Sequence, residues 1–378
     1  MCSWKANSSN DERFMAEAIR LATQGRGATA PNPCVGAVLV DDGRIVARGW
    51  HTRCGQLHAE RECLANAREL GIDPTGMTMF VTLEPCNHHG KTPPCTDAII
   101  EAGIAKVCVG TRDPNPVAAG GVEKLKHHGI QVTVGILEQQ CTDLIADFLL
   151  WQRSHSPFNI VKMAATLDGK IASRERKPEP VSSPESFARV HALRGMVGAV
   201  VVGGTTFYAD NPSLTCRLDT LPDDFIQPFG VVVTSRLPED PASHTLLRDR
   251  PEQAIFMTTE SAARSTAADR LRSRGSSVWP LPGSPGNLTL AYGFERLRYE
   301  KGCHYTLCEG GGTFAMTLIE QGLADELIHF VTPRILGDNL APAAYSGRAS
   351  VSMADAVNFR IINTEMTGTD IMLTMRHA

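Results

Sequence analysis

Two short segments of the chain contain the residue types of a catalytic zinc site. The first is His58-Ala59-Glu60, and the second runs from Glu84-Pro85-Cys86 to Cys95. One imidazole and two thiolates supply three ligands and leave the fourth tetrahedral position open for water, as a catalytic zinc requires. Glu60, two residues after the histidine, is where a hydrolytic deaminase keeps the carboxylate that carries protons. The sequence therefore predicts one zinc site per chain and a zinc-dependent deamination.

Each of these motifs alone has an ordinary structural explanation. A His-x-Glu pair is more often part of a solvated helix face, and a cysteine after a proline is usually a small buried hydrophobe. Their order along the chain, and the proline directly before Cys86, favour the zinc deaminase. A non-enzymatic zinc protein is the weakest alternative, because a structural site needs a fourth protein ligand and has no use for Glu60.

The spacing of the two cysteines departs from the general deaminase signature. That signature has two residues between its cysteines, whereas eight separate Cys86 from Cys95. The long loop, together with Pro31-Asn32-Pro33 and Asp113-Pro114-Asn115-Pro116, resembles the deaminase half of a bacterial riboflavin-biosynthesis family in which a deaminase is fused to a reductase. The resemblance covers nearly all of the chain. It implies a cytidine-deaminase-like three-layer domain in which Asn32 and His51 contact the substrate ring and ribose and Lys91 its phosphate.

A glycine-rich turn in the second half indicates a phosphate-binding site. Glu309-Gly310-Gly311-Gly312-Thr313 follows a predicted strand and begins a predicted helix, and Gly203-Gly204-Thr205-Thr206 ends another strand. Glycines there let backbone amides approach a pyrophosphate at a helix N-terminus. The spaced glycines of the standard dinucleotide-binding fingerprint are missing, so a standard Rossmann fold is disfavoured.

The second half resembles the reductase of the same fused family, whose α/β fold is like that of dihydrofolate reductase. The matching runs are residues 162–170, 209–217, 309–311 and 325–327. An arginine fork suits a phosphate group, and a carboxylate suits sugar hydroxyls. The resemblance implies substrate contacts from Arg194, Leu214, Arg217 and Glu309, and NADPH contacts from Lys162, Ala164, Thr206, Asp210, Ser235, Gly310 and Gly311.

One loop departs from that family. Its members usually carry a Gly-x-Ser-x-Trp motif whose serine and tryptophan touch substrate and cofactor, and the aligned positions here are Arg176, Pro178 and Pro180. Proline offers neither a hydroxyl nor an indole. Two explanations stay open. Either the reductase is active and other groups replace the serine and the tryptophan in its site, or the C-terminal half is a non-catalytic module.

Alternating apolar runs and turn residues predict strands and helices in both halves. In the first half we expect strands at 35–40, 45–49, 77–82, 106–110 and 131–134, and helices at 11–25, 59–70, 95–102 and 122–128. Such alternation is typical of an α/β sheet with helices on both faces. His58 and Cys95 then lie near helix N-termini, where the helix dipole favours a thiolate over a thiol.

Residues 151–157 interrupt this pattern with polar residues and a proline, so we expect a linker there. It would separate a deaminase domain at 1–150 from a reductase domain at 158–378. In the second half we expect strands at 159–164, 198–203, 230–234, 254–257, 305–308 and 326–332, and helices at 186–194 and 313–322.

Composition excludes several functional classes. The 378 residues are 42% hydrophobic and 21% charged, and their net charge of −4 argues against a deaminase that edits nucleic acid, which needs a basic surface. No apolar run is long enough to cross a membrane, and the polar N-terminus indicates a cytoplasmic protein. Its 11 cysteines are then expected to be reduced. We further expect a homo-oligomer that binds neither nucleic acid nor membrane.

The expected function is therefore bifunctional. The N-terminal domain would remove the ring 2-amino group of 2,5-diamino-6-ribosylamino-4(3H)-pyrimidinone 5′-phosphate, with Glu60 acting first as base and then as acid. The C-terminal domain would reduce the ribosyl side chain to ribityl with NADPH. The alternatives are a monofunctional deaminase with a non-catalytic reductase-like domain, and an enzyme of another pyrimidine or pterin pathway.

Overall fold

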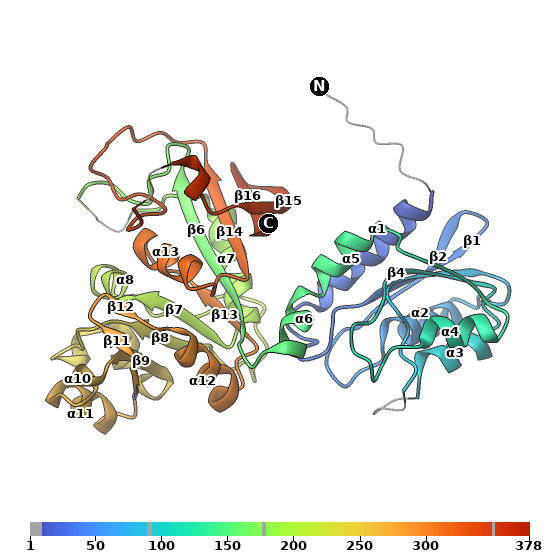
Figure 1. The fold of residues 1–378 in the computed structure, drawn as a ribbon, viewed down its shortest axis with the longest axis horizontal. Helices are drawn as coiled ribbons and strands as arrows, with labels where there is room; N and C mark the ends of the chain where they lie inside the picture. Colours follow the sequence, from blue (N-terminus) through green and yellow to red (C-terminus); the bar gives the residue numbers. More distant parts are fainter. Residues whose placement is uncertain (1–9, 89–92, 176–178, 350–351) are drawn as a thin grey trace. The chain divides into compact units, whose positions relative to one another are not determined.

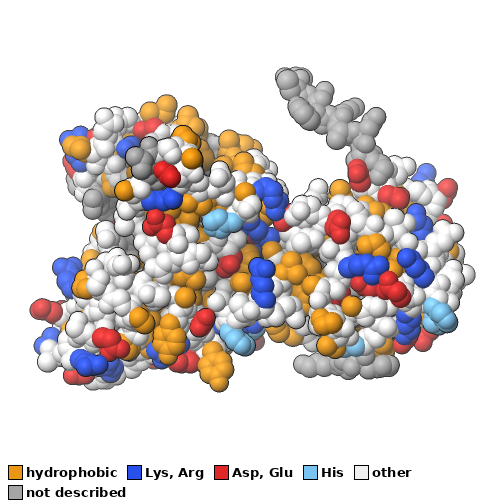
Figure 2. Space-filling view, viewed as in Figure 1, with side chains coloured by type: hydrophobic (Ala, Val, Ile, Leu, Met, Phe, Trp, Pro, Cys, Tyr) orange, Lys and Arg blue, Asp and Glu red, His pale blue; other side chains and the backbone are white. Residues whose placement is uncertain are grey.

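The computed structural model describes residues 10–88, 93–175, 179–349 and 352–378, and the chain divides into two compact units, Met1–Ser154 and His155–Ala378. Helix α6 (Ala146–Arg153) extends through the first residues of the expected linker, and the division falls just after it. No helix in the described part of the chain is long and apolar enough to cross a membrane. On the face drawn in Figure 2, basic and acidic side chains are intermingled among the described residues.

The first unit contains one five-stranded sheet with the strand order β2-β1-β3-β4-β5. Strand β1 is antiparallel to both of its neighbours, and β3, β4 and β5 are parallel. The strands are β1 (Gly36–Asp41), β2 (Arg44–Trp50), β3 (Thr78–Leu83), β4 (Lys106–Thr111) and β5 (Gln131–Val134). The helices are α1 (Asn10–Ala22), the 3-10 turn η1 (Thr23–Gly25), α2 (Ala59–Glu69), α3 (Cys95–Glu101), α4 (Gly121–His127), α5 (Glu138–Leu144) and α6.

The side chains of β1 alternate between two hydrophobic cores, and the helices that contribute to each core form a separate layer. Ala37 and Leu39 belong to the core that includes residues of α2, α3 and α4, whereas Val38 and Val40 belong to the core with residues of α1 and α5. Because successive side chains of a strand point to opposite faces, an almost continuously apolar strand must be covered on both sides. The result is the three-layer arrangement seen in Figure 1, with α1 and α5 on one face of the sheet and α2, α3 and α4 on the other.

Close packing of α2 on the sheet depends on Gly49 in β2. A Cβ atom at this position would lie 2.2 Å from the backbone nitrogen of Cys63 and 2.5 Å from the carbonyl oxygen of Ala59. The backbone of α2 therefore rests directly on β2. This contact fixes the beginning of α2, for which His58 is the N-cap.

The second unit contains a nine-stranded sheet with the order β10-β9-β8-β7-β13-β6-β14-β16-β15. Its strands are β6 (Phe158–Thr166), β7 (Ala199–Gly203), β8 (Phe229–Val233), β9 (Ala254–Thr259), β10 (Ser277–Leu281), β13 (Tyr305–Cys308), β14 (Glu326–Thr332), β15 (Phe359–Thr367) and β16 (Asp370–His377). A separate two-stranded ribbon consists of β11 (Gly283–Ser284) and β12 (Asn287–Leu288). From β10 to β14 in this order the strands are parallel, and the hairpin β15–β16 joins the edge at β14 in antiparallel orientation.

Helices cover both faces of the second sheet. Helices α12 (Ala291–Lys301) and α13 (Gly312–Glu320) contribute to a core with residues of β6, β7, β8 and β9. On the opposite face, Phe207 of α8 (Gly204–Asp210) meets Phe256 edge to face, with ring centroids 5.6 Å apart. The remaining helices are α7 (Pro184–Met196), α9 (Thr245–Asp249), α10 (Glu260–Ala263), α11 (Thr266–Ser273), and the 3-10 turns η2 (Pro241–Ser243), η3 (Pro251–Gln253) and η4 (Met353–Asp355).

The first turn of α7 is tied to the C-terminal hairpin through Asp370. Its buried carboxylate accepts hydrogen bonds from the Ser183 backbone N–H at 2.7 Å and from the Ser186 hydroxyl at 2.6 Å. Ser183 is also the N-cap of α7, where its hydroxyl accepts from the Ser186 N–H. These bonds join segments 187 residues apart and fix the direction of α7.

We expect Gly49→Ala to destabilise the first unit. The added methyl group collides with the backbone of α2, and overpacking of this kind costs about 1 to 3 kcal/mol. Calorimetry should record a lower unfolding temperature for the N-terminal unit. Gly195→Ala in α7 is the control, because its Cβ would meet Cys216 Sγ at an ordinary 3.5 Å. An unchanged unfolding temperature in the Gly49 variant would contradict the packing argument.

Candidate functional site

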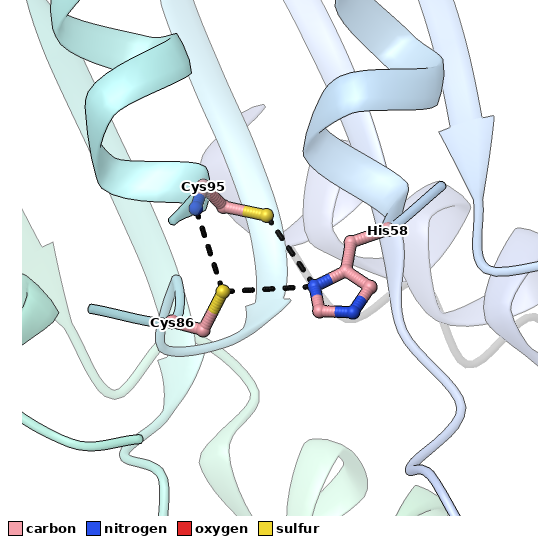
Figure 3. A group of neighbouring side chains, drawn as sticks. All are labelled: His58, Cys86 and Cys95. Atoms are coloured by element: carbon pink, nitrogen blue, oxygen red, sulfur yellow. Dashed lines mark hydrogen bonds between the residues drawn. The ribbon is translucent and has the colours of Figure 1, made fainter. Parts of the chain in front are cut away.

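Three side chains from separate segments of the first unit converge on one point (Figure 3). His58 precedes α2, Cys95 begins α3, and Cys86 lies in the loop after β3. Their ligand atoms all lie within 4.8 Å of one another, with His58 Nδ1 3.6 Å from Cys86 Sγ and 3.4 Å from Cys95 Sγ. Tetrahedral zinc, with ligand distances of about 2.0 Å to nitrogen and about 2.3 Å to sulfur, places these atoms about 3.5 Å apart. The donor set and its spacing therefore fit zinc.

Hydrogen bonds among these protein groups favour a thiolate at Cys86. The bond from the Cys95 thiol, followed in strength by interactions with His58, lowers the pKa of Cys86 to about 4, although burial opposes this shift. The same bond raises the pKa of Cys95. The Cys95 backbone N–H also donates to Cys86 Sγ at 3.4 Å. Two sulfur atoms this close need a shared proton or a cation between them.

Glu60 lies beside the cluster without belonging to it. Its side chain is 3% exposed and in hydrogen-bond contact with Cys95. Burial, reinforced by the negative charge of Cys86, raises the pKa of this carboxyl group. A carboxyl group with a raised pKa binds a proton more readily than an ordinary carboxyl group, which suits a proton carrier. The helix explains the placement, because His58 is the N-cap of α2 and Glu60 is the second residue of its first turn.

Asn32 and His51 lie next to the same cluster. The His51 ring meets the His58 ring edge to face with centroids 5.3 Å apart. His51 Nδ1–H donates to the Leu57 carbonyl at 2.9 Å, which leaves Nε2 as an acceptor 3.4 Å from Asn32 Nδ2. Burial lowers the pKa of His51 and so favours this neutral ring. Lys91 and His89 lie outside the described residues, and His88 is not part of the cluster.

The second unit contains a cavity of about 890 Å³ at the carboxyl ends of its parallel strands. The turn after β13, residues 309–312, contributes one wall, and the start of α8 after β7 contributes another. A Cβ atom at Gly311 would have no neighbour nearer than Thr206 Oγ1, at 4.0 Å, so any side chain there would project into the cavity. Nine of the expected residues line it: Lys162, Ala164, Arg194, Thr206, Asp210, Leu214, Glu309, Gly310 and Gly311.

Three of these residues form a charged group at the base of the cavity. Arg194 donates two hydrogen bonds to the Glu309 carboxylate, at 2.6 and 2.9 Å, and a third to the Thr215 carbonyl at 2.9 Å. Burial acts to raise the pKa of Glu309, but Arg194 and then Lys162 outweigh it, so the pKa is lowered. Burial lowers the pKa of Lys162, and the Glu309 charge partly opposes this. The cavity therefore holds an ionised carboxylate that is paired with Arg194.

Two family models match the chain, one on each half. The RibD C-terminal domain matches residues 157–373, and the cytidine and deoxycytidylate deaminase zinc-binding region matches residues 8–111. The riboflavin biosynthesis protein RibD of Aquifex aeolicus is 36% identical over 364 residues, which cover 96% of this chain and 97% of the relative. That of Escherichia coli is 34% identical, over 96% of this chain and 98% of the relative. The chain belongs to the RibD family.

Solved structures of the family agree over the same length. Acinetobacter baumannii RibD superimposes with a TM-score of 0.73 at 31% identity, covering 98% of this chain and 99% of the other. A diaminohydroxyphosphoribosylaminopyrimidine deaminase/5-amino-6-(5-phosphoribosylamino)uracil reductase of Thermotoga maritima does so with a TM-score of 0.75 at 36% identity, with the same coverage. RibD proteins combine a zinc-binding deaminase domain with a reductase domain in riboflavin biosynthesis, and the predicted family, fold class and pair of activities are confirmed. The His/Cys/Cys cluster and the reductase domain fit zinc and NADPH as cofactors.

Some residues implied by the RibD resemblance lie away from the cavity. Arg217 is exposed and contacts His191 and Ser213, and Ser235 is exposed after β8. Neither lines the cavity. Of the three positions aligned with the RibD Gly-x-Ser-x-Trp motif, 176 and 178 lie outside the described residues, and Pro180 lines the cavity.

Sequence reasoning missed Arg250, which supports the loop containing Leu214. Arg250 is 8% exposed and donates to the carbonyl oxygens of Ser213, at 2.8 Å, and Leu214, at 2.9 Å. Leu214 itself has a φ of 54°, a left-handed conformation that is costly for a leucine and persists only where neighbours fix it. The local sequence around Arg250 resembles an exposed charged turn, so only the long-range contact identifies it.

We expect Arg194→Lys to weaken the reductase about 10- to 100-fold in kcat/KM. Lysine keeps the charge but replaces the planar fork, and a lost hydrogen bond to a charged group is worth about 1.5 to 3 kcal/mol. Steady-state NADPH oxidation is the measurement. Arg189→Lys is the matched control, because Arg189 lies on the same helix but pairs with Glu365 at the surface. Equal activity of the two variants would argue against a role for the Arg194 fork.

Proposed function

We propose that the first unit deaminates 2,5-diamino-6-ribosylamino-4(3H)-pyrimidinone 5′-phosphate, and that the second unit reduces the ribosyl side chain of the product with NADPH. The observation that carries the proposal is the convergence of His58, Cys86 and Cys95 at zinc-ligand spacing beside the buried carboxyl group of Glu60. The name of the Thermotoga maritima relative, a deaminase and reductase of phosphoribosylaminopyrimidines, supports the choice of substrate.

In the deamination, His58, Cys86 and Cys95 hold the zinc ion, which when bound activates the attacking water as a Lewis acid. Glu60 accepts a proton from that water while a C–O bond forms at ring carbon 2. It then gives the proton to the departing amino group as the C–N bond breaks and ammonia leaves. A buried carboxyl group with a raised pKa is suited to both steps, since the raised pKa makes it a stronger base towards the water and keeps the proton available for the amino group.

Asn32 and His51 position the substrate in this scheme. The neutral His51 ring, oriented by its bond to Leu57, and the Asn32 amide offer hydrogen bonds beside the zinc ligands. Lys91 would meet the substrate phosphate. The negative charge of a phosphate and the ammonium group of lysine make this a simple ionic contact.

In the reduction, NADPH when bound would supply a hydride to C1′ of the ribosyl group, whose bond to the ring oxygen would break. The ring oxygen takes up a proton and becomes the 4′-hydroxyl of the ribityl chain. Glu309 would bind the sugar hydroxyls at this centre, and Arg194 holds Glu309 in place. The proposed substrate site consists of Arg194, Leu214 and Glu309, and the proposed NADPH site of Lys162, Ala164, Thr206, Asp210, Gly310 and Gly311. Arg217 for the substrate and Ser235 for NADPH stay predictions, because neither lines the cavity. A cytoplasmic homo-oligomer stays a prediction.

Glu60→Gln should lower deamination at least about 100-fold while zinc remains bound, because the substitution removes the proton carrier and leaves the ligands intact. Cys95→Ser should instead lose both zinc and deamination. Zinc content by mass spectrometry and release of ammonia distinguish the two variants. Reductase activity, measured in the same chains, should be unchanged and serves as the internal control. A zinc-free Glu60→Gln enzyme, or a fully active Cys95→Ser enzyme, would refute these assignments.

NADPH should be oxidised when the deaminated intermediate is added, even though proline replaces the serine and tryptophan of the usual loop. We expect cofactor binding weaker by on the order of 1 kcal/mol than in a relative with the tryptophan, whose indole adds stacking. Glu309→Ala should abolish oxidation, and Glu295→Ala on the exposed face of α12 should not. If NADPH neither binds nor is consumed while ammonia is released normally, the reductase half of the proposal is wrong.

A further inference from the structure

We infer that Glu84 is a positioning residue of the deaminase centre. Its carboxylate binds the segment between β4 and α4, and that segment in turn holds Cys86 in place. Glu84 directly follows β3 and stands two residues before Cys86. Among the described residues, no contact joins the Glu84 side chain to any of the proposed zinc ligands. The inference rests on the proposed zinc-dependent deamination and adds a residue that acts through Cys86.

The Glu84 carboxylate accepts hydrogen bonds from three backbone N–H groups of one segment. Oε2 accepts from Asp113 at 3.2 Å, and Oε1 accepts from Gly120 at 3.2 Å and from Val122 at 3.0 Å. Its side chain is 1% exposed, and Arg112, which lies 4.0 Å away, pairs more closely with Glu123. A buried carboxylate is retained at such a place only when its oxygens are satisfied, and here backbone amides satisfy them.

These three bonds fix both ends of the connection from β4 (Lys106–Thr111) to α4 (Gly121–His127). Asp113 lies just after the strand, whereas Gly120 and Val122 lie at the first turn of the helix, where N–H groups have no partners within the helix. Gly120 has a φ of 93°, so the chain turns sharply into α4 at this point. One carboxylate therefore closes the connection into a loop of fixed shape.

The closed loop then contacts the residues on either side of Cys86. The carbonyl oxygen of Pro85 rests against the backbone at Gly121, where a Cβ atom would lie 1.9 Å from it. The Asn87 N–H donates to the Ala118 carbonyl at 3.1 Å. Cys86 is thus held from both neighbours by a segment that Glu84 closes. A shift of that segment would move the sulfur atom relative to His58 and Cys95.

Replacement of Glu84 by glutamine tests the role with minimal change of volume. The amide has one acceptor oxygen where the carboxylate has two, so its NH₂ group must face at least one of the three N–H donors. We expect zinc to bind about 10- to 100-fold more weakly, the usual effect of removing a group that orients a metal ligand. Chelator competition on the full chain measures this. After cobalt substitution, the thiolate-to-cobalt absorption bands should shift, because they report the position of the cysteine sulfur atoms.

Glu123→Gln is the matched control. It removes the exposed partner of Arg112 on α4, next to the same loop, and should leave zinc affinity and the cobalt spectrum unchanged. Glu84→Asp keeps the negative charge on a shorter side chain and should give an intermediate zinc affinity. This variant replaces Glu84→Gln in the test if the glutamine variant does not fold. NADPH oxidation by the second unit checks that each variant chain is otherwise intact.

The outcomes separate this inference from the proposed function. If the unaltered protein binds no zinc or releases no ammonia, the proposed function fails. If it does both, and folded Glu84→Gln and Glu84→Asp keep its zinc affinity and cobalt spectrum, only the positioning role is overturned. A lower unfolding temperature with unchanged zinc affinity and spectrum would likewise overturn it, because a purely structural residue behaves in that way.

Discussion

The deaminase half depends on holding one nitrogen and two sulfur atoms within 4.8 Å of one another, although they come from three segments of the chain. Thiolates at such distances repel each other unless a cation or a proton lies between them. The scaffold must therefore be rigid before the metal arrives. Rigidity comes from backbone contacts that side chains would prevent, such as α2 against Gly49 and the Pro85 carbonyl against Gly121. Each zinc ligand is positioned by one of these contacts or lies directly beside it.

The site of the reductase half holds a different set of charged groups but lies at a similar place in its fold. Its cavity also lies where parallel strands end and helices begin, at the turns after β7 and β13. Arg194 and Glu309 form an ion pair that lines the cavity, and the Glu309 charge partly opposes the burial that lowers the pKa of Lys162. These groups suit ligands that carry phosphate groups and hydroxyl groups together. In both units the proposed site thus lies at one edge of a sheet, and residues of the connecting loops determine which reaction it can catalyse.

Local sequence was sufficient wherever a residue's role is determined by its neighbours in the chain. The spacing in His58-Ala59-Glu60, the proline before Cys86 and the glycines at 310–312 led to the cluster, the buried carboxyl group and the cavity. The strands and helices that were predicted in the first half lie within about two residues of the observed ones for the same reason, when α1 is counted with the 3-10 turn that follows it, but α5 and α6 were not predicted. The hairpin β15–β16 was missed, since β15 alternates weakly between apolar and polar residues and owes its stability to pairing along β16.

Residues whose partners are distant in the chain could not be found in this way. Arg250 holds a loop 36 residues earlier, and Asp370 binds Ser183 across 187 residues. Nothing in the flanking sequence of either residue distinguishes it from an exposed charge, because each acts on the backbone of a remote segment. Glu84 is an intermediate case. The sequence motif that contains Glu84 was recognised. The three backbone amides that give its carboxylate a role lie 29 to 38 residues later in the chain.

The described residues on either side of 176–178 are held by arginine side chains. Arg174, before the loop, forms two hydrogen bonds with Asp338, at 2.9 and 2.7 Å, and Arg334 donates to the carbonyl oxygen of Pro180 at 3.0 Å. Both ends of the loop are thereby tied to the segment after β14. The fixed φ of proline restricts the backbone further at position 180. Residues 179–182 line the cavity, so the described end of the loop forms part of its wall without the hydroxyl and the indole of the usual motif. A proline in this place lacks the aromatic face with which an indole stacks on a cofactor.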